Sequence, residues 1–273
     1  MGIDKSLKIY LAGHRGMVGS SILNNLESKG YSNFVFTPSD KYDLINQGIV
    51  EDFFNKEKPD YVIIAAAKVG GIVANNEFRA DFLYQNLMIQ NNLIHSSSAN
   101  GVKKLIFLGS SCIYPRDCNQ PIKEEYLLTG ELEKTNEPYA IAKISGIKMC
   151  ESYFKQHNNN FISVMPTNLY GPRDNFDLNN SHVIPALIRK FHSAKINKLP
   201  SVEIWGTGKP KREFLHVDDL ADACVFLFEN LDSNKLYPFG ISQINIGCGN
   251  DLSIGDLSKL IKKIVGFKGT IKF

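Results

Sequence analysis

The 273-residue sequence lacks several features that would assign it to a specialised class of protein. Its longest apolar run, Tyr61–Ala67, falls far short of the ~20 residues that span a bilayer, and its first residues hold no apolar signal core. Its five cysteines are odd in number and form no C-x-x-C pair, which argues against a disulfide framework. The net charge of +3 is too small to indicate a nucleic-acid partner. We therefore expect a cytoplasmic protein that binds neither a membrane nor a nucleic acid, and no metal site.

The first half of the chain alternates between short apolar runs and amphipathic stretches. Strands are predicted at residues 7–12, 34–36, 60–67, 104–109 and 161–165, and helices at 17–29, 49–54, 83–99 and 138–157. Strand and helix in regular succession predict a parallel sheet with right-handed crossovers and helices on both faces. The expected fold is therefore α/β, a doubly wound, Rossmann-like parallel sheet with a smaller α/β part after it.

The second half is less regular. Residues 168–181 are rich in Asn, Asp, Gly and Pro, which favours a loop. Beyond it the pattern predicts helices at 183–195, 217–229 and 253–265 and strands at 202–205, 244–246 and 270–273. The last helix begins with the capping pattern Ser253-x-x-Asp256.

A glycine-rich loop joins the first strand to the first helix. Gly13, Gly16 and Gly19 form the pattern G-x-x-G-x-x-G. Glycine lets the backbone turn sharply and approach a pyrophosphate, while the following helix N-terminus offers unpaired N–H groups and the positive end of its dipole. The position of this loop therefore predicts a dinucleotide-binding site.

The residues after the second strand do not decide between NAD and NADP as the cofactor. The end of the second strand, residues 36–41, has neither the acidic residue that binds a ribose hydroxyl nor a clear basic partner for a 2′-phosphate. Arg15 is a candidate for that phosphate, with Ser39 and Lys41 assisting. The alternative is that Arg15 is an exposed loop charge.

A serine-rich strand end and a Tyr-x-x-x-Lys helix predict the reactive groups. Tyr139 and Lys143 share one face of a helix, and a nearby cation is expected to lower the pKa of the phenol. A phenol of this kind can protonate a carbonyl oxygen. Ser110 follows the fourth strand, where a doubly wound sheet binds its ligands. Cys112, two residues later, faces the same side if the backbone is extended.

With these motifs the chain resembles the extended short-chain dehydrogenase/reductases, and within them the enzymes that epimerise GDP-4-keto-6-deoxymannose at C3 and C5 and reduce it at C4. The resemblance is carried by residues 13–19, 65–75, 109–115, 136–143, 165–172, 179–185 and 212–219. It implies NADP(H) as the cofactor, GDP-4-keto-6-deoxymannose as the substrate and a homodimer formed through the helices at 83–99 and 138–157. A related GDP-4-keto-sugar enzyme, such as a colitose-forming one, is the alternative within this class.

The resemblance also implies roles for individual residues. Catalysis falls to Ser110, Cys112, Tyr139, Lys143 and His182, with Cys112 and His182 as the acid/base pair of the epimerisation. The residues that match cofactor-binding positions are Gly13, Arg15, Gly16, Met17, Val18, Gly19, Ser39, Leu44, Ala66, Tyr139, Lys143, Pro166, Asn168, Leu169 and His182. The residues that match substrate-binding positions are Ser110, Ser111, Asn168, Val183, Trp205 and Arg212. Without the resemblance, Cys112 would be a core thiol, His182 a loop histidine and Trp205 a packing residue.

The expected division of the chain follows from these assignments. Residues 1–166 form an NADP-binding domain, to which the chain returns at about 214–247, and residues 167–273 form the substrate-binding part. The family continues beyond the strand at 270–273, so the substrate-binding part is expected to be shortened. A shortened form that binds the dinucleotide without catalysis is therefore a further alternative.

Overall fold

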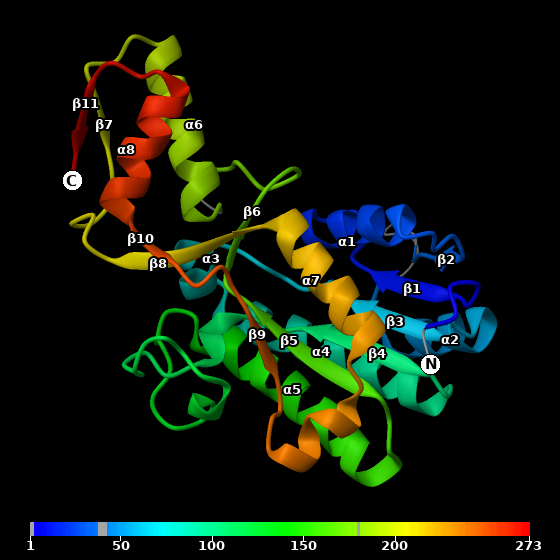
Figure 1. Ribbon diagram of the computed structural model, residues 1–273. Helices are drawn as coiled ribbons and strands as arrows, with labels where there is room; N and C mark the ends of the chain where they lie inside the picture. Colours follow the sequence, from blue (N-terminus) through cyan, green and yellow to red (C-terminus); the bar gives the residue numbers. More distant parts are fainter. Residues whose placement is uncertain (1–2, 38–42, 179–180) are drawn as a thin grey trace.

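The computed structural model describes residues 3–37, 43–178 and 181–273 and is built around a six-stranded parallel sheet (Figure 1). The strand order is β2-β1-β3-β4-β5-β9. The strands are β1 (Ile9–Ala12), β2 (Phe34–Val35), β3 (Tyr61–Ile64), β4 (Lys104–Leu108), β5 (Phe161–Pro166) and β9 (Ile244–Ile246). All neighbouring pairs in this sheet are parallel, which confirms the predicted fold class.

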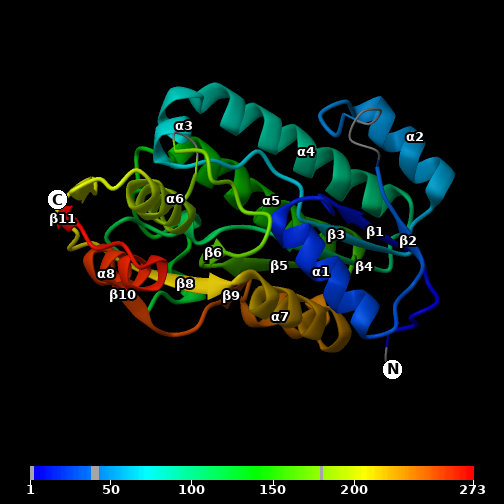
Figure 2. The ribbon, with the colours of Figure 1, turned by 90° about the horizontal axis from the view of Figure 1, so that it is seen from above.

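Helices cover both faces of the sheet (Figure 2). One face is covered by α1 (Met17–Ser28) and α7 (Val217–Asn230), and the other by α2 (Gln47–Glu57), α4 (Arg79–Ala99) and α5 (Glu137–His157). Side chains alternate along each strand, so Tyr10 enters the core on the α2, α4 and α5 side while Ile9 and Leu11 enter the opposite core. A short helix, α3 (Ile72–Glu77), precedes α4.

A smaller lobe, which we call the C-terminal lobe and define as residues 183–212 and 251–273, has its own core. It contains α6 (Val183–Ile196), α8 (Ile254–Val265), β7 (Ser201–Glu203) and β11 (Thr270–Lys272). Phe191, Leu257 and Phe267 lie in that core. The predicted cap of α8 is confirmed, because the Ser253 hydroxyl accepts a hydrogen bond from the Asp256 N–H at 3.0 Å.

A second sheet joins the lobe to the rest of the molecule. Its order is β10-β8-β6, with strands β6 (Asn168–Tyr170), β8 (Lys211–His216) and β10 (Asp251–Ser253). The prediction of a loop across 168–181 is therefore wrong at its start. The polar segment becomes a strand because β8, more than 40 residues away in the chain, supplies its hydrogen-bonding partner, and local composition does not reveal such a partner.

Candidate active site

The glycine loop lies where a dinucleotide pyrophosphate needs close backbone approach. Gly13 has φ +88°, and a Cβ there would lie 2.7 Å from the Ala66 backbone nitrogen at the end of the neighbouring β3. A Cβ on Gly19 would clash with the Gly13 carbonyl oxygen. Both positions therefore require glycine.

The start of α1 is open for an anion. Gly16 is the N-cap residue, no side chain caps the helix, and its first turn holds no acidic residue. The first N–H groups and the positive end of the dipole are thus left for a ligand, which fits the phosphates of NADP(H). Met17 and Val18 begin this helix, and Ala66 lies beside the loop.

The adenine side of the predicted cofactor site is described only in part. Ser39 and Lys41 lie outside the described residues. Arg15 is exposed in the loop. Leu44 is half-buried, and its carbonyl accepts a hydrogen bond from the Asn92 amide of α4 at 2.9 Å.

Four of the predicted catalytic side chains, from the segment after β4 and from α5, come together at the carboxyl end of β4. Ser110 follows β4 with extended backbone, and residues Ser111–Ile113 form a single 3-10 turn, η1. The Ser110 hydroxyl hydrogen-bonds to the Cys112 thiol, and Cys112 interacts electrostatically with Tyr139 and Lys143. The expectation that Ser110 and Cys112 face the same side of an extended backbone is wrong in its geometry, because η1 turns the chain, and the turn itself brings the two side chains together.

The helix α5 carries Tyr139 and Lys143 one turn apart. Lys143 is 3% exposed, and its ammonium donates a hydrogen bond to the Leu108 carbonyl at 2.9 Å. Tyr139 is half-buried and packs edge-on against Phe82 of α4, with 6.3 Å between the ring centroids. The side chains of two helices and one strand end therefore enclose the phenol and the ammonium.

Burial dominates the protonation of this cluster. It raises the pKa of Tyr139 well above its ordinary value, raises that of the Cys112 thiol to about 11 and lowers that of Lys143 to about 8. The expectation of a lowered pKa for Tyr139 is wrong for this structure, because desolvation of the phenolate raises that pKa and the neighbouring Cys112 thiol raises it further. Tyr139 is consequently held as a neutral phenol, which is the form that donates a proton.

Three further predicted residues lie where the sheet leads into the second sheet. Pro166 ends β5 beside Ile246. Asn168 begins β6, and its amide donates to the Glu213 carbonyl of β8 at 2.9 Å. Leu169 is half-buried against the core on the α1 and α7 side.

His182 and Val183 begin α6 and stand apart from the cluster on β4 and α5. His182 is exposed and is the N-cap residue of the helix. Among the described residues its electrostatic partner is Asp174. Burial raises the pKa of the Asp174 carboxyl, and the attraction of His182 offsets only part of that increase. One Asp174 carboxylate oxygen is buried without a hydrogen-bond partner. The structure thus brings Ser110, Cys112, Tyr139 and Lys143 together and places His182 on a separate element.

Trp205 and Arg212 lie on the C-terminal lobe and face solvent. Trp205 is 69% exposed, so the alternative that it packs in a core is wrong. Arg212 on β8 is exposed, and its guanidinium donates to the Lys211 carbonyl at 2.7 Å. Sequence reasoning missed Lys190, whose ammonium lies 4.9 Å from the centroid of the Trp205 ring. The available signal was its spacing, because Lys190 comes two helical turns after Val183 on α6.

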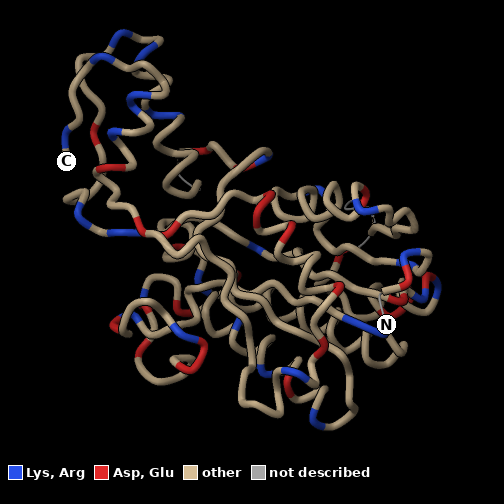
Figure 3. Tube along the Cα trace, viewed as in Figure 1, with Lys and Arg blue, Asp and Glu red and all other residues tan. Residues whose placement is uncertain are grey.

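The lobe around these residues is strongly basic (Figure 3). It contains twelve Lys and Arg residues against three Asp and Glu residues, in a chain whose net charge is +3. The rest of the chain is therefore net acidic. An excess of exposed cations beside an aromatic ring suits a ligand that carries both a base and a diphosphate.

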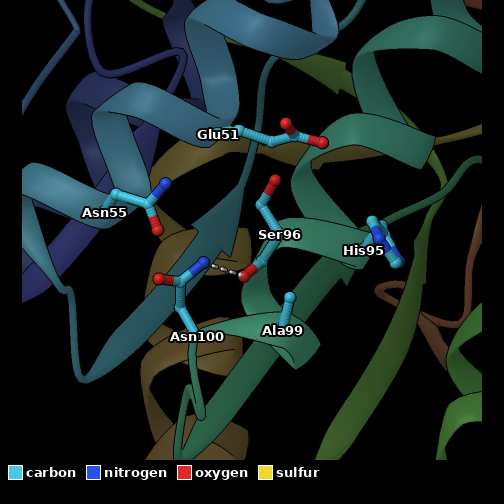
Figure 4. A pocket seen from close by; sticks show the side chains of 6 residues that line it. All are labelled: Glu51, Asn55, His95, Ser96, Ala99 and Asn100. Atoms are coloured by element: carbon cyan, nitrogen blue, oxygen red, sulfur yellow. Dashed lines mark hydrogen bonds between the residues drawn. The ribbon is translucent and has the colours of Figure 1, made fainter.

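A cavity of about 230 Å³ lies elsewhere on the molecule (Figure 4). Its lining comes from α2, α4 and the residue after α4, namely Glu51, Asn55, His95, Ser96, Ala99 and Asn100. The end of α4 adjoins the amino edge of the parallel sheet, whereas the predicted site residues follow the carboxyl ends of the strands. No predicted site residue lines this cavity.

Two features bear on membranes and metals. Within residues 3–37, 43–178 and 181–273, no helix is long and apolar enough to cross a membrane. The same residues contain no group of three or more His, Cys, Asp or Glu side chains that could hold a metal ion.

Comparison with known proteins identifies the family. The model of the NAD dependent epimerase/dehydratase family matches residues 9–247. The chain is 57% identical to GDP-L-fucose synthase 1 of Arabidopsis thaliana over 98% of its own length and 81% of that protein, and 53% identical to GDP-L-fucose synthase of Escherichia coli K12 over 97% and 84%. It is 42% identical to GDP-L-colitose synthase of Yersinia pseudotuberculosis over 98% and 85%.

Solved structures agree with the sequence relatives. A GDP-mannoheptose C4 reductase from Campylobacter jejuni with NADP bound has a TM-score of 0.92 and 44% identity, and covers 100% of this chain and 89% of that one. Relatives of this kind confirm the resemblance to the extended short-chain dehydrogenase/reductases.

Proposed function

The chain belongs to the NAD dependent epimerase/dehydratase family, and we propose that it is an NADPH-dependent 3,5-epimerase and 4-reductase that converts GDP-4-keto-6-deoxy-D-mannose to GDP-L-fucose. The observation that carries the proposal is the cluster of Ser110, Cys112, Tyr139 and Lys143 at the carboxyl end of β4. The chain is more similar to the fucose synthases of Arabidopsis thaliana and Escherichia coli than to the colitose synthase, so the colitose-forming alternative is not favoured.

The glycine loop would hold the cofactor. Gly13, Gly16, Met17, Val18 and Gly19 present backbone to its pyrophosphate. Arg15 and Ser39 are proposed to bind its 2′-phosphate, and the other contacts are proposed for Leu44, Ala66, Pro166, Asn168, Leu169, Lys143 and His182. When bound, NADPH supplies the hydride for the reduction.

In the reduction, we assign to Tyr139 the proton that goes to the C4 oxygen of the sugar. Burial keeps this phenol protonated before the step, as an acid must be. Ser110 orients the carbonyl oxygen by its hydroxyl. Lys143, one helical turn away, supplies positive charge that stabilises the phenolate left behind.

The epimerisation is assigned to Cys112 and His182. It needs one group that removes a proton next to the ketone and another that returns a proton on the opposite face. The two side chains come from η1 and from the start of α6, so they can approach a sugar held between the sheet edge and the lobe from two directions.

The basic lobe is proposed to bind the GDP moiety. Arg212 matches the chemistry of a diphosphate, since a guanidinium forms two charge-assisted hydrogen bonds with it. Trp205 offers an exposed ring face to the base, and Lys190 lies beside it. Ser111, Asn168 and Val183 complete the proposed set.

The remaining proposals concern organisation. Residues 1–166, with the return at 214–247, form the cofactor domain, and residues 167–273 form the substrate part. A cytoplasmic homodimer through α4 and α5 is part of the proposal. The interface is supported by Tyr84 and Ile141 on these helices, which are 59% and 42% exposed. The oligomeric state is checked by light scattering.

The function is tested with GDP-4-keto-6-deoxy-D-mannose and NADPH. We expect oxidation of NADPH and the appearance of GDP-L-fucose. A folded sample that oxidises no NADPH contradicts the proposal, and faster turnover of a colitose precursor favours the related enzyme. Calorimetry with NADPH and with GDP separates the non-catalytic alternative, which predicts binding of the first ligand without the second.

A further inference from the structure

Lys143 is a buried cation that pairs with no carboxylate in the described part of the chain. Its side chain is 3% exposed, and the charged-state partner found for it among the described residues is the Cys112 thiol rather than a carboxylate. Its hydrogen bond goes to the Leu108 carbonyl at 2.9 Å. A buried charge held by one neutral oxygen needs further stabilisation to stay charged.

Two aromatic rings face this ammonium. It lies 4.8 Å from the centroid of Phe107, on β4, and 5.7 Å from that of Tyr139. Phe107 is fully buried. A cation within about 6 Å of a ring face is attracted by the ring quadrupole, and the attraction is larger where water is excluded.

A glycine in α5 lets the Phe107 ring approach the helix. A Cβ on Gly146 would contact the Phe107 ring, with Cε1 at 2.7 Å, and the Gln90 amide carbon at 3.1 Å. Gln90 of α4 in turn donates to the Ala142 carbonyl of α5 at 2.5 Å. The Phe107 ring, α5 and α4 therefore pack against one another beside Lys143.

We propose that Phe107 is a positioning residue, whose ring face keeps the Lys143 ammonium charged and in place beside Tyr139. The inference rests on the proposed function only for the use that Lys143 has in the reduction. The contrasting interpretation is that Phe107 only fills the core, like Phe161 of the neighbouring β5, which is also fully buried.

The groups that surround Lys143 leave its pKa dependent on the nearby Phe107 ring. Cys112 of η1 and Tyr139 of α5 are the titratable groups beside it, β4 contributes a carbonyl and a ring, and α4 contributes the neutral amide of Gln90. Burial already lowers the pKa of Lys143 to about 8. A further decrease of one unit would leave much of it neutral at neutral pH.

The test weakens the ring quadrupole while keeping the shape of the side chain. 3,5-Difluoro- and 3,4,5-trifluorophenylalanine replace Phe107, and in matched control proteins they replace Phe161. The pKa of Lys143 is measured in the ligand-free protein by NMR of lysine labelled with ¹³C at Cε, and its resonance is assigned with Lys143→Met. We expect the pKa to fall with each added fluorine at position 107, by about one unit for the trifluoro ring, and to stay at the parent value in the controls.

Equal pKa values in the parent and the trifluoro protein, or equal shifts at positions 107 and 161, would overturn the proposal. If fluorinated chains do not fold, Phe107→Leu and Phe161→Leu are compared by the same measurement. The pH profile of NADPH oxidation is recorded in parallel. A parent that does not reduce the GDP-sugar contradicts the proposed function, whereas an unchanged Lys143 pKa contradicts this inference alone.

Discussion

The predicted site residues at the sheet edge are enclosed, whereas those on the C-terminal lobe are exposed. At the carboxyl end of β4, Tyr139, Lys143 and Cys112 are enclosed by packed elements, and burial shifts the pKa of each. On the lobe, Trp205 and Arg212 face solvent, and positive charge accumulates around them.

This difference suits the proposed division of the activity, with the chemical steps at the sheet edge and substrate binding on the lobe. Under the proposed function, the groups at the sheet edge are in place before a ligand binds, because strand order and helix packing position them. The lobe has a smaller core, and the substrate-binding residues proposed on it, Trp205 and Arg212, are exposed. Changes at the edge should therefore alter the chemical steps, and changes on the lobe should alter binding.

The largest effect is expected for Tyr139→Phe. Loss of the proton donor should lower kcat for NADPH oxidation about 10²- to 10⁴-fold with little change in melting temperature. Tyr153→Phe is the matched control on the same helix, since that hydroxyl bonds to His95 at 2.6 Å and should leave kcat unchanged. Similar losses in both variants would contradict the role of Tyr139.

Gly19→Ala should disrupt the cofactor loop. Its Cβ would clash with the Gly13 carbonyl oxygen, so we expect NADPH affinity to fall by tenfold or more, measured by calorimetry. Gly48→Ala in α2 is the control, because its Cβ would have an ordinary contact 3.5 Å from the Asn46 side chain. That control should stabilise the protein by roughly 0.5 kcal/mol and bind NADPH as the parent does.

Lys143→Met should increase the free energy of unfolding, because it removes a buried charge. The pKa of Lys143 lies at about 8 in the folded protein against 10.5 for an unperturbed lysine, so the unfolded chain binds more protons between these values. The free energy of unfolding of the parent therefore rises with pH from about 8 to 10.5. Urea unfolding should show that the variant is more stable than the parent at pH 7, by up to ~3 kcal/mol, and that the gain shrinks across that window. A gain that does not depend on pH would contradict a buried charge.

The smallest effect is expected for Arg212→Ala on the lobe. Loss of the proposed diphosphate contact should raise KM for the GDP-sugar about tenfold and leave NADPH affinity and melting temperature unchanged. Lys272→Ala, an exposed cation on β11, is the control and should leave KM unchanged. A decrease of kcat without a change of KM in Arg212→Ala would contradict the assignment of substrate binding to the lobe and of the chemical steps to the sheet edge.

The sequence predicted the sheet edge better than the lobe. Gly13–Gly19 and the strand ends could be found because glycine spacing and the alternation of strands with helices are local signals with a physical meaning. The strand at Asn168–Tyr170 could not, because its stability depends on pairing with β8. The turn at Ser111–Ile113 and the raised pKa of Tyr139 also arise from packing around these residues, which spacing does not report.

The lobe depends most on distant contacts. The stacking of Lys190 on Trp205 brings together a helix and the residues after a strand. The spacing of Lys190 from Val183 places it on a face of α6, but the pairing with Trp205 depends on how the lobe folds. Exposure also separates the cysteines, since Cys150 is buried whereas Cys248 is exposed.

The central claim is that the cluster at the sheet edge performs the chemistry, with Cys112 in the epimerisation. Its most direct test is the incorporation of deuterium from D₂O at C3 and C5 of the GDP-sugar, followed by NMR in the parent, in Cys112→Ser and in the control Cys248→Ser. We expect the parent and the control to incorporate deuterium and Cys112→Ser to lose at least a hundredfold in rate. Incorporation by Cys112→Ser at the parent rate would contradict the account.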